Sequence, residues 1–168
     1  RRLARRFNDR FGETFKIPEK YTKKEGKRIM GLDDPNKKMS KSAPSEYNRI
    51  DLLDSADEIR NKIKKAVTDS GNTIEYTDER PAIKNLLNIF SLTSDKTPEE
   101  LVTHFKGKGF KEFKEELAES IVAFLSPFQE RYNAISDENV QKILDQGKTQ
   151  TKKIATGKLE EVKQKMGL

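Results

Sequence analysis

The stretch from Asp34 to Ser45, DPNKKMSKSAPS, holds the residues of this chain that are best suited to chemistry. It contains three lysines and three serines, with hardly any apolar side chain to bury. Lysine ammonium groups cannot leave water without a partner, so the stretch either faces bulk solvent or meets an anion. Pro35 and Pro44 bracket most of it, and proline disfavours helix in the preceding residue, so we predict a loop over Asn36–Ala43.

The spacing of the polar groups favours a phosphate as the anion. Ser40 and Ser42 alternate with Lys38 and Lys41, so hydroxyl donors lie beside the ammonium groups and can reach the same phosphate oxygens. Met39 lies between them and can turn inward while the lysines face a polyphosphate. On charge alone a solvated linker is an equal alternative. The interleaved hydroxyls favour a loop that closes over a leaving group.

Composition limits the class of protein that can carry this loop. The chain has 168 residues, 33% of them hydrophobic and 37% charged, which suits amphipathic helices with charged outer faces. It has no cysteine and a single histidine, His104, so neither a disulfide framework nor a thiolate or histidine metal site is expected. No apolar run approaches the length of a membrane span and no signal-type N-terminus is present, so we expect neither membrane insertion nor secretion.

The positive charge is concentrated near the start of the chain. The net charge is +6, and residues 1–42 hold 14 Lys and Arg against 6 Asp and Glu. Bulk attraction to phosphate is therefore expected in the first quarter of the chain. The chain opens RRLARRFNDRFG, inside an amphipathic helical pattern and without a methionine, which we interpret as the middle of a larger protein.

Most of the remaining chain has helical periodicity. A first helix is predicted to end with Gly12 just past it, and the segment Gly26–Leu32 is predicted to be a short strand or an extended segment that leads into the loop. Proline and capping residues predict further helix starts at Ser55 or Asp54, Pro81, Thr97 and Ser136 or Asp137. The apolar stripes that follow them predict a mainly α fold, a helical bundle from Ser55 onward that follows a short loop-and-strand remnant.

Three details of these helices are also predicted. The helix after Ser55 should extend far enough to place Ala66 and Val67 on its apolar stripe. Pro127 should kink or divide the long helix that carries Phe113–Tyr132. Gly147 and Gly157 each weaken the last helix by roughly 1 kcal/mol relative to alanine, so its stability should come from packing.

Lys38–Ser42 resembles the KMSKS signature of class I aminoacyl-tRNA synthetases, and its neighbours resemble those of the tryptophanyl-tRNA synthetases of bacterial and organellar type. The resemblance implies that residues 1–54 end a Rossmann-type α/β catalytic domain with the KMSKS loop. It also implies that residues 55–168 form the helical domain that meets the tRNA anticodon. The segments that carry it are RRLARRFNDRFGETFKIPE, RIMGLDDPNKKMSKS, AVTDSG, NLLNIF, KGKGFKEFKEELAE and LSPFQERY.

The resemblance implies part of a tryptophan–tRNA ligase, which activates tryptophan with ATP to tryptophanyl-adenylate and transfers it to tRNA(Trp). In the family an HIGH-like motif, the amino-acid pocket and the dimer contacts precede the first residue seen here. The chain is therefore interpreted as a C-terminal half that is inactive alone. ATP with Mg²⁺, tryptophan, tRNA(Trp) and a homodimer in the complete enzyme are the implied partners, in the cytoplasm, with an organelle left open. No protein metal ligand is assigned, because Asp33 and Asp34 before a proline are more typical of a turn.

The resemblance also assigns roles to single residues. Lys41 and Lys38 would be catalytic residues that bind the ATP phosphates, and Ser40 and Ser42 would donate further hydrogen bonds to ATP. Met39 would either contact ATP or pack the loop onto the domain, and Ile29 would either lie against the adenine or belong to the core of the strand. Candidate RNA contacts, for which charged outer helix faces are the simpler interpretation, are Lys106, Lys108, Lys111, Lys152 and Lys153.

One alternative of a different class stays open from the sequence. The chain could be a free-standing helical RNA-binding module related to the anticodon domain. Tyrosyl-tRNA synthetases are the nearest other enzymes, and AVTDSG together with a full KMSKS favours tryptophan.

Overall fold

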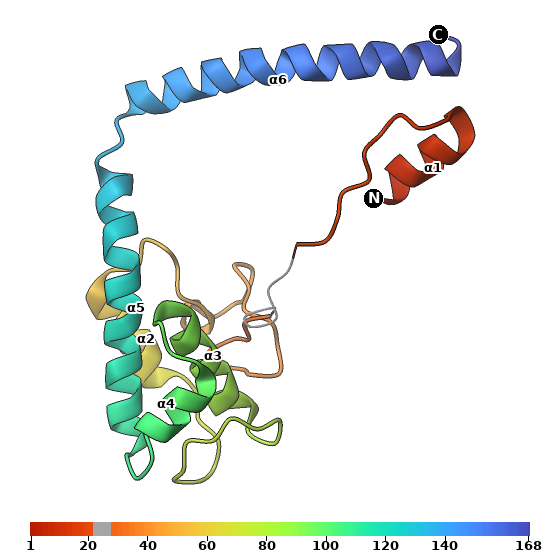
Figure 1. Ribbon diagram of the computed structural model, residues 1–168. Coiled ribbons are helices and arrows are strands. Elements are labelled where there is room, and N and C mark those ends of the chain that lie inside the picture. Colours follow the sequence, from red (N-terminus) through yellow and green to blue (C-terminus); the bar gives the residue numbers. More distant parts are fainter. Residues whose placement is uncertain (22–27) are drawn as a thin grey trace. The chain divides into compact units, whose positions relative to one another are not determined.

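The computed structural model describes residues 1–21 and 28–168, and these are mainly helical (Figure 1). The mainly α fold is thereby confirmed. No strand is formed by the described residues. The helices are α1 (Arg2–Phe11), α2 (Ala56–Lys65), α3 (Pro81–Thr93), α4 (Pro98–His104), α5 (Phe110–Asn133) and α6 (Asp137–Met166), with one 3₁₀ turn at Glu46–Asn48.

The chain divides into two compact units. One combines Arg1–Thr22 with Asn133–Leu168, and the other is Lys23–Tyr132, which carries the lysine-rich loop and α2 to α5. The boundary at 54/55 concerns the domains of the family and stays a prediction, since this division rests on contacts within the chain.

The predicted helix starts are present with their capping geometry. Ser55 and Thr97 cap α2 and α4, and each forms a capping box with the glutamate three residues on, Glu58 or Glu100. Pro81 occupies the first turn of α3. In both boxes the glutamate carboxyl accepts hydrogen bonds from the backbone N–H and the hydroxyl of the capping residue. These bonds lower the pKa of the glutamate carboxyl, and the backbone bond has the larger effect. The stabilisation from these boxes is therefore present above the ordinary carboxyl pKa and lost as the pH falls through the lowered one.

An aromatic cluster forms the centre of the larger unit. Phe105 ends α4 and meets Phe113 of α5 edge-on, with ring centroids 5.1 Å apart. Phe90 of α3 lies 5.9 Å from the ring of Phe105 and 6.0 Å from that of Phe113. All three are buried, together with Leu86, Leu87, Leu101 and Leu117. This core packs α3 against α4 and α5.

Helix α2 is shorter than predicted. It ends at Lys65, so the placement of Val67 on its apolar stripe is wrong, and that side chain is 43% exposed. The physical reason is competition for the backbone. The N–H of Val67 donates to Leu32 O at 2.7 Å, and the ammonium of Lys114 donates to the carbonyls of Lys64 and Ala66, at 3.2 and 2.7 Å.

Pro127 does not divide α5, which runs without a break from Phe110 to Asn133 (Figure 1). Contacts on both sides of the proline keep this part of the helix in place. Leu125 is buried in the core, and the amide of Gln129 donates to the carbonyls of Leu52 and Asp54, both at 2.9 Å.

The last helix begins as predicted, with Ser136 as its cap. None of the residues of α6 is fully buried, and the expectation that packing stabilises this helix stays a prediction. Its contacts to the N-terminal segment are polar. Lys158 donates to Thr14 O at 2.8 Å, and Lys165 donates to Glu13 O at 2.7 Å.

Among the helices described, none combines the length and the apolar character that crossing a membrane requires.

A buried ion pair closes the segment between the loop and α2. The ammonium of Lys62 lies 2.6 Å from Asp54 Oδ2, and the side chains are 9% and 10% exposed. Asp54 Oδ2 also accepts the N–H of Asp51 at 2.8 Å. Because both charges are withdrawn from water, the loss of either one leaves its partner buried and uncompensated.

We expect Asp54→Ala to lower the free energy of unfolding by about 3–5 kcal/mol, since it strands the Lys62 ammonium. The matched control is Glu119→Ala, which breaks the exposed pair with Arg60 and should cost less than about 1 kcal/mol. Urea unfolding followed by circular dichroism measures both. Equal losses in the two variants would contradict the importance of burial at Asp54.

Candidate phosphate-binding loop

The loop is built on a single antiparallel bridge between Met30 and Lys38. Its two hydrogen bonds join the neighbours of these residues. The N–H of Gly31 donates to Lys37 O at 2.8 Å, and the N–H of Met39 donates to Ile29 O at 3.0 Å. The bridge therefore fixes the backbone of Lys38 opposite that of Met30.

A tight turn closes the loop at Asp34–Lys37. The N–H of Lys37 donates to Asp34 O at 3.1 Å, and Asp34 Oδ1 accepts the N–H of Asn36 at 3.0 Å. The Lys37 ammonium lies 2.9 Å from Asp34 Oδ2. This contact is the main cause that lowers the pKa of the Asp34 carboxyl and raises the pKa of Lys37. Asp34 thus forms a turn, and Lys37 is occupied by its own loop.

Of the two forms predicted for Gly26–Leu32, a short strand or an extended segment, the strand is not formed by the described residues beyond this one bridge. Gly26 and Lys27 lie outside the described residues, and Arg28 to Leu32 form no strand. The physical reason lies at Met30. Its outward-facing N–H and C=O pair with the side chain of Asn85 on α3, both at 2.9 Å, where a strand would pair with another strand.

A second asparagine, Asn48, holds the other end of the loop. Its side chain is buried, with the residue 4% exposed. Asn48 Oδ1 accepts the N–H of Ser40 at 3.1 Å, and Asn48 Nδ2 donates to Asp33 Oδ1 at 2.6 Å. Beyond this point the loop turns back, with the N–H of Ala43 donating to Ser40 O at 3.2 Å.

The predicted loop residues separate into two environments. Ile29 and Met39 are half-buried and pack against the core. Lys38, Ser40, Lys41 and Ser42 are exposed. Neither Lys38 nor Lys41 forms an ion pair with any residue that the structure describes. The loop therefore presents its cations and hydroxyls to water while its apolar side chains face the protein.

Sequence reasoning missed both asparagines. Asn85 opens the NLLNIF segment, and a polar residue between Ile83 and Leu86 on an apolar face was a signal that could have found it. Asn48 gave no such signal, because it lies in a short turn with no periodic pattern around it.

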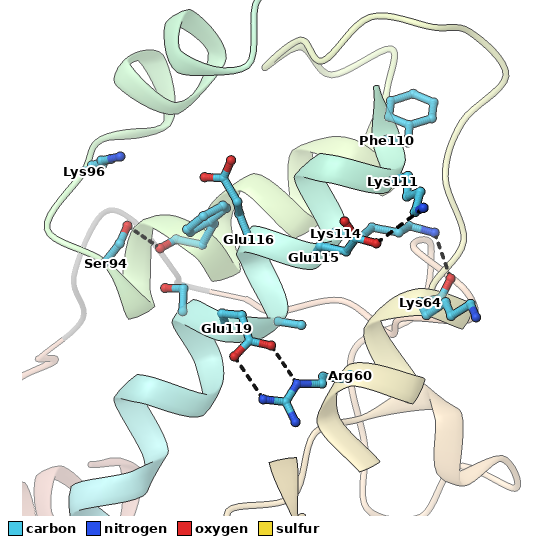
Figure 2. A pocket seen from close by; sticks show the side chains of 13 residues that line it. Arg60, Lys64, Ser94, Lys96, Phe110, Lys111, Lys114, Glu115, Glu116 and Glu119 are labelled. Atoms are coloured by element: carbon cyan, nitrogen blue, oxygen red, sulfur yellow. Dashed lines mark hydrogen bonds and ion pairs between the residues drawn. The ribbon is translucent and has the colours of Figure 1, made fainter. Parts of the chain in front are cut away.

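One candidate RNA contact, Lys111, lines a groove of about 1080 Å³ that α2, α3 and α5 form (Figure 2). Phe90, Phe110 and Ala118 supply apolar lining, and Lys64, Lys96, Lys111 and Lys114 supply the cations. Burial lowers the pKa of the Lys114 ammonium, which is turned to the backbone carbonyls at the end of α2.

The five candidate lysines differ in how far they are engaged. Lys108 contacts Glu112 at 3.1 Å and Glu116 at 3.2 Å, whereas Lys111 lies 3.9 Å from Glu115 with 89% of its side chain exposed. Lys106 is exposed at the turn between α4 and α5, and Lys152 and Lys153 are exposed on α6.

Comparison with known proteins places this loop in a family. The family described as "tRNA synthetases class I (W and Y)" matches residues 1–126. The tryptophan–tRNA ligase of Helicobacter pylori is 46% identical over all of this chain and 52% of its own length, and that of Caldanaerobacter subterraneus is 48% identical over the same shares.

Solved structures give the same result. The tryptophanyl-tRNA synthetase of Mycoplasma pneumoniae matches the whole chain with a TM-score of 0.90 and 31% identity, over 51% of its own length. That of Campylobacter jejuni, complexed with ADP and tryptophan, matches the whole chain and 52% of its own with a TM-score of 0.69 and 30% identity. This chain spans about half the length of the relatives it matches. It belongs to the class I tRNA synthetase family of the tryptophan and tyrosine enzymes, and the tryptophanyl-tRNA synthetases match it over its whole length.

Proposed function

We propose that this chain supplies the ATP-phosphate loop and the RNA-contacting helices of a tryptophan–tRNA ligase, as the C-terminal half of that enzyme. The observation that carries the proposal is the division of the loop. Lys38 and Lys41 face water from a backbone that Asn48 and Asn85 hold in place. The tryptophan–tRNA ligases that match the whole chain support the amino acid, and the neighbour complexed with ADP and tryptophan supports the nucleotide.

The reaction explains the need for two lysines. In adenylation the carboxylate of tryptophan attacks the α-phosphorus of ATP, a new carboxyl–phosphate bond forms, and the bond to pyrophosphate breaks. Negative charge then builds on the leaving pyrophosphate, and preorganised cations there lower the barrier. Lys41 and Lys38 act on these phosphates, with Ser40 and Ser42 as further donors. Ile29 lies toward the adenine, and Met39 holds the loop against the protein.

Magnesium enters this site with ATP. Mg²⁺ keeps several waters and binds through phosphate oxygens in such sites. The two carboxylates at the start of the loop already have partners, since Asp33 Oδ1 accepts from Asn48 and Asp34 pairs with Lys37. We therefore assign the ion to the ATP phosphates and water rather than to a protein site. In the complete enzyme we propose a homodimer that acts in the cytoplasm.

We expect Lys41→Ala to slow tryptophan-dependent ATP–pyrophosphate exchange by about 100-fold, because a cation is removed from the developing charge. The KM for tryptophan should stay nearly unchanged. The measurement uses the complete polypeptide that contains the chain, and the 168 residues alone should show no exchange. Lys37→Ala is the matched control, because Lys37 pairs with Asp34 within the same loop. Unchanged exchange in Lys41→Ala, or robust exchange by the 168 residues alone, would refute the assignment.

The helical part is proposed to contact tRNA(Trp) through exposed lysines. An exposed ammonium with at most one distant carboxylate can displace a counterion from a phosphate, whereas an ammonium held by two close carboxylates gains less from that contact. We therefore rank Lys108 below the four other candidates, which are Lys106, Lys111, Lys152 and Lys153.

For RNA binding we expect Lys111→Ala to weaken the complex with tRNA(Trp) and to lower the slope of log K against log salt by about 0.7–0.9. Lys108→Ala should change the slope less, because Glu112 and Glu116 already neutralise its charge. Filter binding at four salt concentrations measures both. If neither Lys111→Ala nor the combined Lys106, Lys152 and Lys153 variant alters the slope, these lysines are only charged outer faces of helices.

A further inference from the structure

Asn85 is a buried polar side chain whose partners lie in the loop rather than in its own helix. It sits on the apolar face of α3 beside Leu86 and Leu87, and it is 4% exposed. Its Oδ1 accepts the N–H of Met30 and its Nδ2 donates to the carbonyl of Met30, both at 2.9 Å. One carboxamide thus satisfies both backbone groups of a residue 55 positions away in the sequence.

The bridge explains why Met30 can be held in this way. The hydrogen bonds of the bridge join Gly31 to Lys37 and Met39 to Ile29, so the backbone groups of Met30 itself face away from Lys38. Asn85 pairs with them as an adjacent strand would. The backbone of Met30 is therefore fixed on one side by α3 and on the other by the segment that carries Lys38.

Asn48 completes the arrangement on the following residues. The N–H of Leu32 donates to Asn48 O at 2.9 Å, and Asn48 Oδ1 accepts from Ser40. Gly31 leaves room for this packing, because a Cβ added there would lie 2.1 Å from Asn48 Nδ2. Asn48 therefore bonds the Ser40 end of this backbone directly, whereas Asn85 acts on the Lys38 end through Met30 and the bridge.

We propose that Asn85 is a positioning residue that sets the place of Lys38 for phosphate binding, and so makes the helical core the template for the ATP loop. This proposal rests on the proposed function. A flexible lysine contributes to a developing charge only if its backbone is already in place. Buried carboxamides are suited to that task, because leaving a buried donor or acceptor unpaired costs the full desolvation penalty of the group.

The test compares two asparagines of α3 in the complete polypeptide that contains the chain. Asn85→Leu removes both hydrogen bonds to Met30 and fills a similar volume with an apolar side chain. Asn88→Leu is the matched control, three residues further along the helix, where Asn88 Oδ1 accepts from the Tyr76 hydroxyl at 2.8 Å. Asn85→Asp keeps the size of the side chain and replaces the donor to Met30 O by a carboxylate oxygen, so it takes the place of Asn85→Leu where that variant does not fold.

We expect Asn85→Leu to lower the kcat of tryptophan-dependent pyrophosphate exchange by roughly 10- to 100-fold, with the KM for tryptophan within about twofold of the original. Asn88→Leu should leave both nearly unchanged. Combined with Lys38→Ala, the Asn85 variant should add little to the loss, because it acts through that lysine. Additive losses, or equal losses in the Asn85 and Asn88 variants, would overturn the proposal.

Amide hydrogen exchange gives a second readout that needs no activity. The amides of Gly31 and Met39 report the bridge directly, and in Asn85→Leu their protection should fall by about 10-fold or more, but not in Asn88→Leu. Unchanged protection in Asn85→Leu refutes the positioning role. If the unsubstituted polypeptide shows no ATP–pyrophosphate exchange while Asn85→Leu still loses amide protection, the result is different. That result refutes the proposed function and leaves the positioning of the loop established.

Discussion

A loop that exposes its lysines to water gains little from apolar burial, so its shape must depend on hydrogen bonds to the rest of the chain. Lys38 and Lys41 face water, so the loop gains little from the hydrophobic effect. Its geometry depends on hydrogen bonds made where water is excluded, at Asn85 and Asn48. Such bonds are worth little net when made and cost a great deal when broken, which favours one conformation over many.

The helices around the loop supply the dry environment that these bonds require. Phe90, Phe105 and Phe113 fix α3 against α4 and α5, and this places Asn85 where Met30 can reach it. The same elements leave the outer faces charged, with Lys108 tied to acids and Lys111 almost fully exposed. One set of packed helices therefore supports the lysine-rich loop and carries exposed cations on its outer faces.

Local signals in the sequence were sufficient for most of the helices. Ser55, Thr97 and Pro81 act within one turn of the chain, because a cap bonds to backbone groups two or three residues away. The predictions failed where distant groups compete. Val67 lies outside α2 because its N–H donates to Leu32 O. Met30 is not part of a strand because its backbone pairs with the side chain of Asn85 on α3. The roles of Lys38, Lys41 and the RNA-facing lysines stay predictions.

The printed sequence was enough to indicate a mainly α chain, the position of a lysine-rich loop and, through that loop and its neighbours, the family. These features depend on residue type and on short spacings along the chain, which can be seen in the sequence without the fold. Only the tertiary structure determines which side chains hold the loop in place. Asn85 and Met30 are 55 residues apart, and their pairing exists because packing of the aromatic core brings α3 beside the bridge and excludes the water that would otherwise satisfy both.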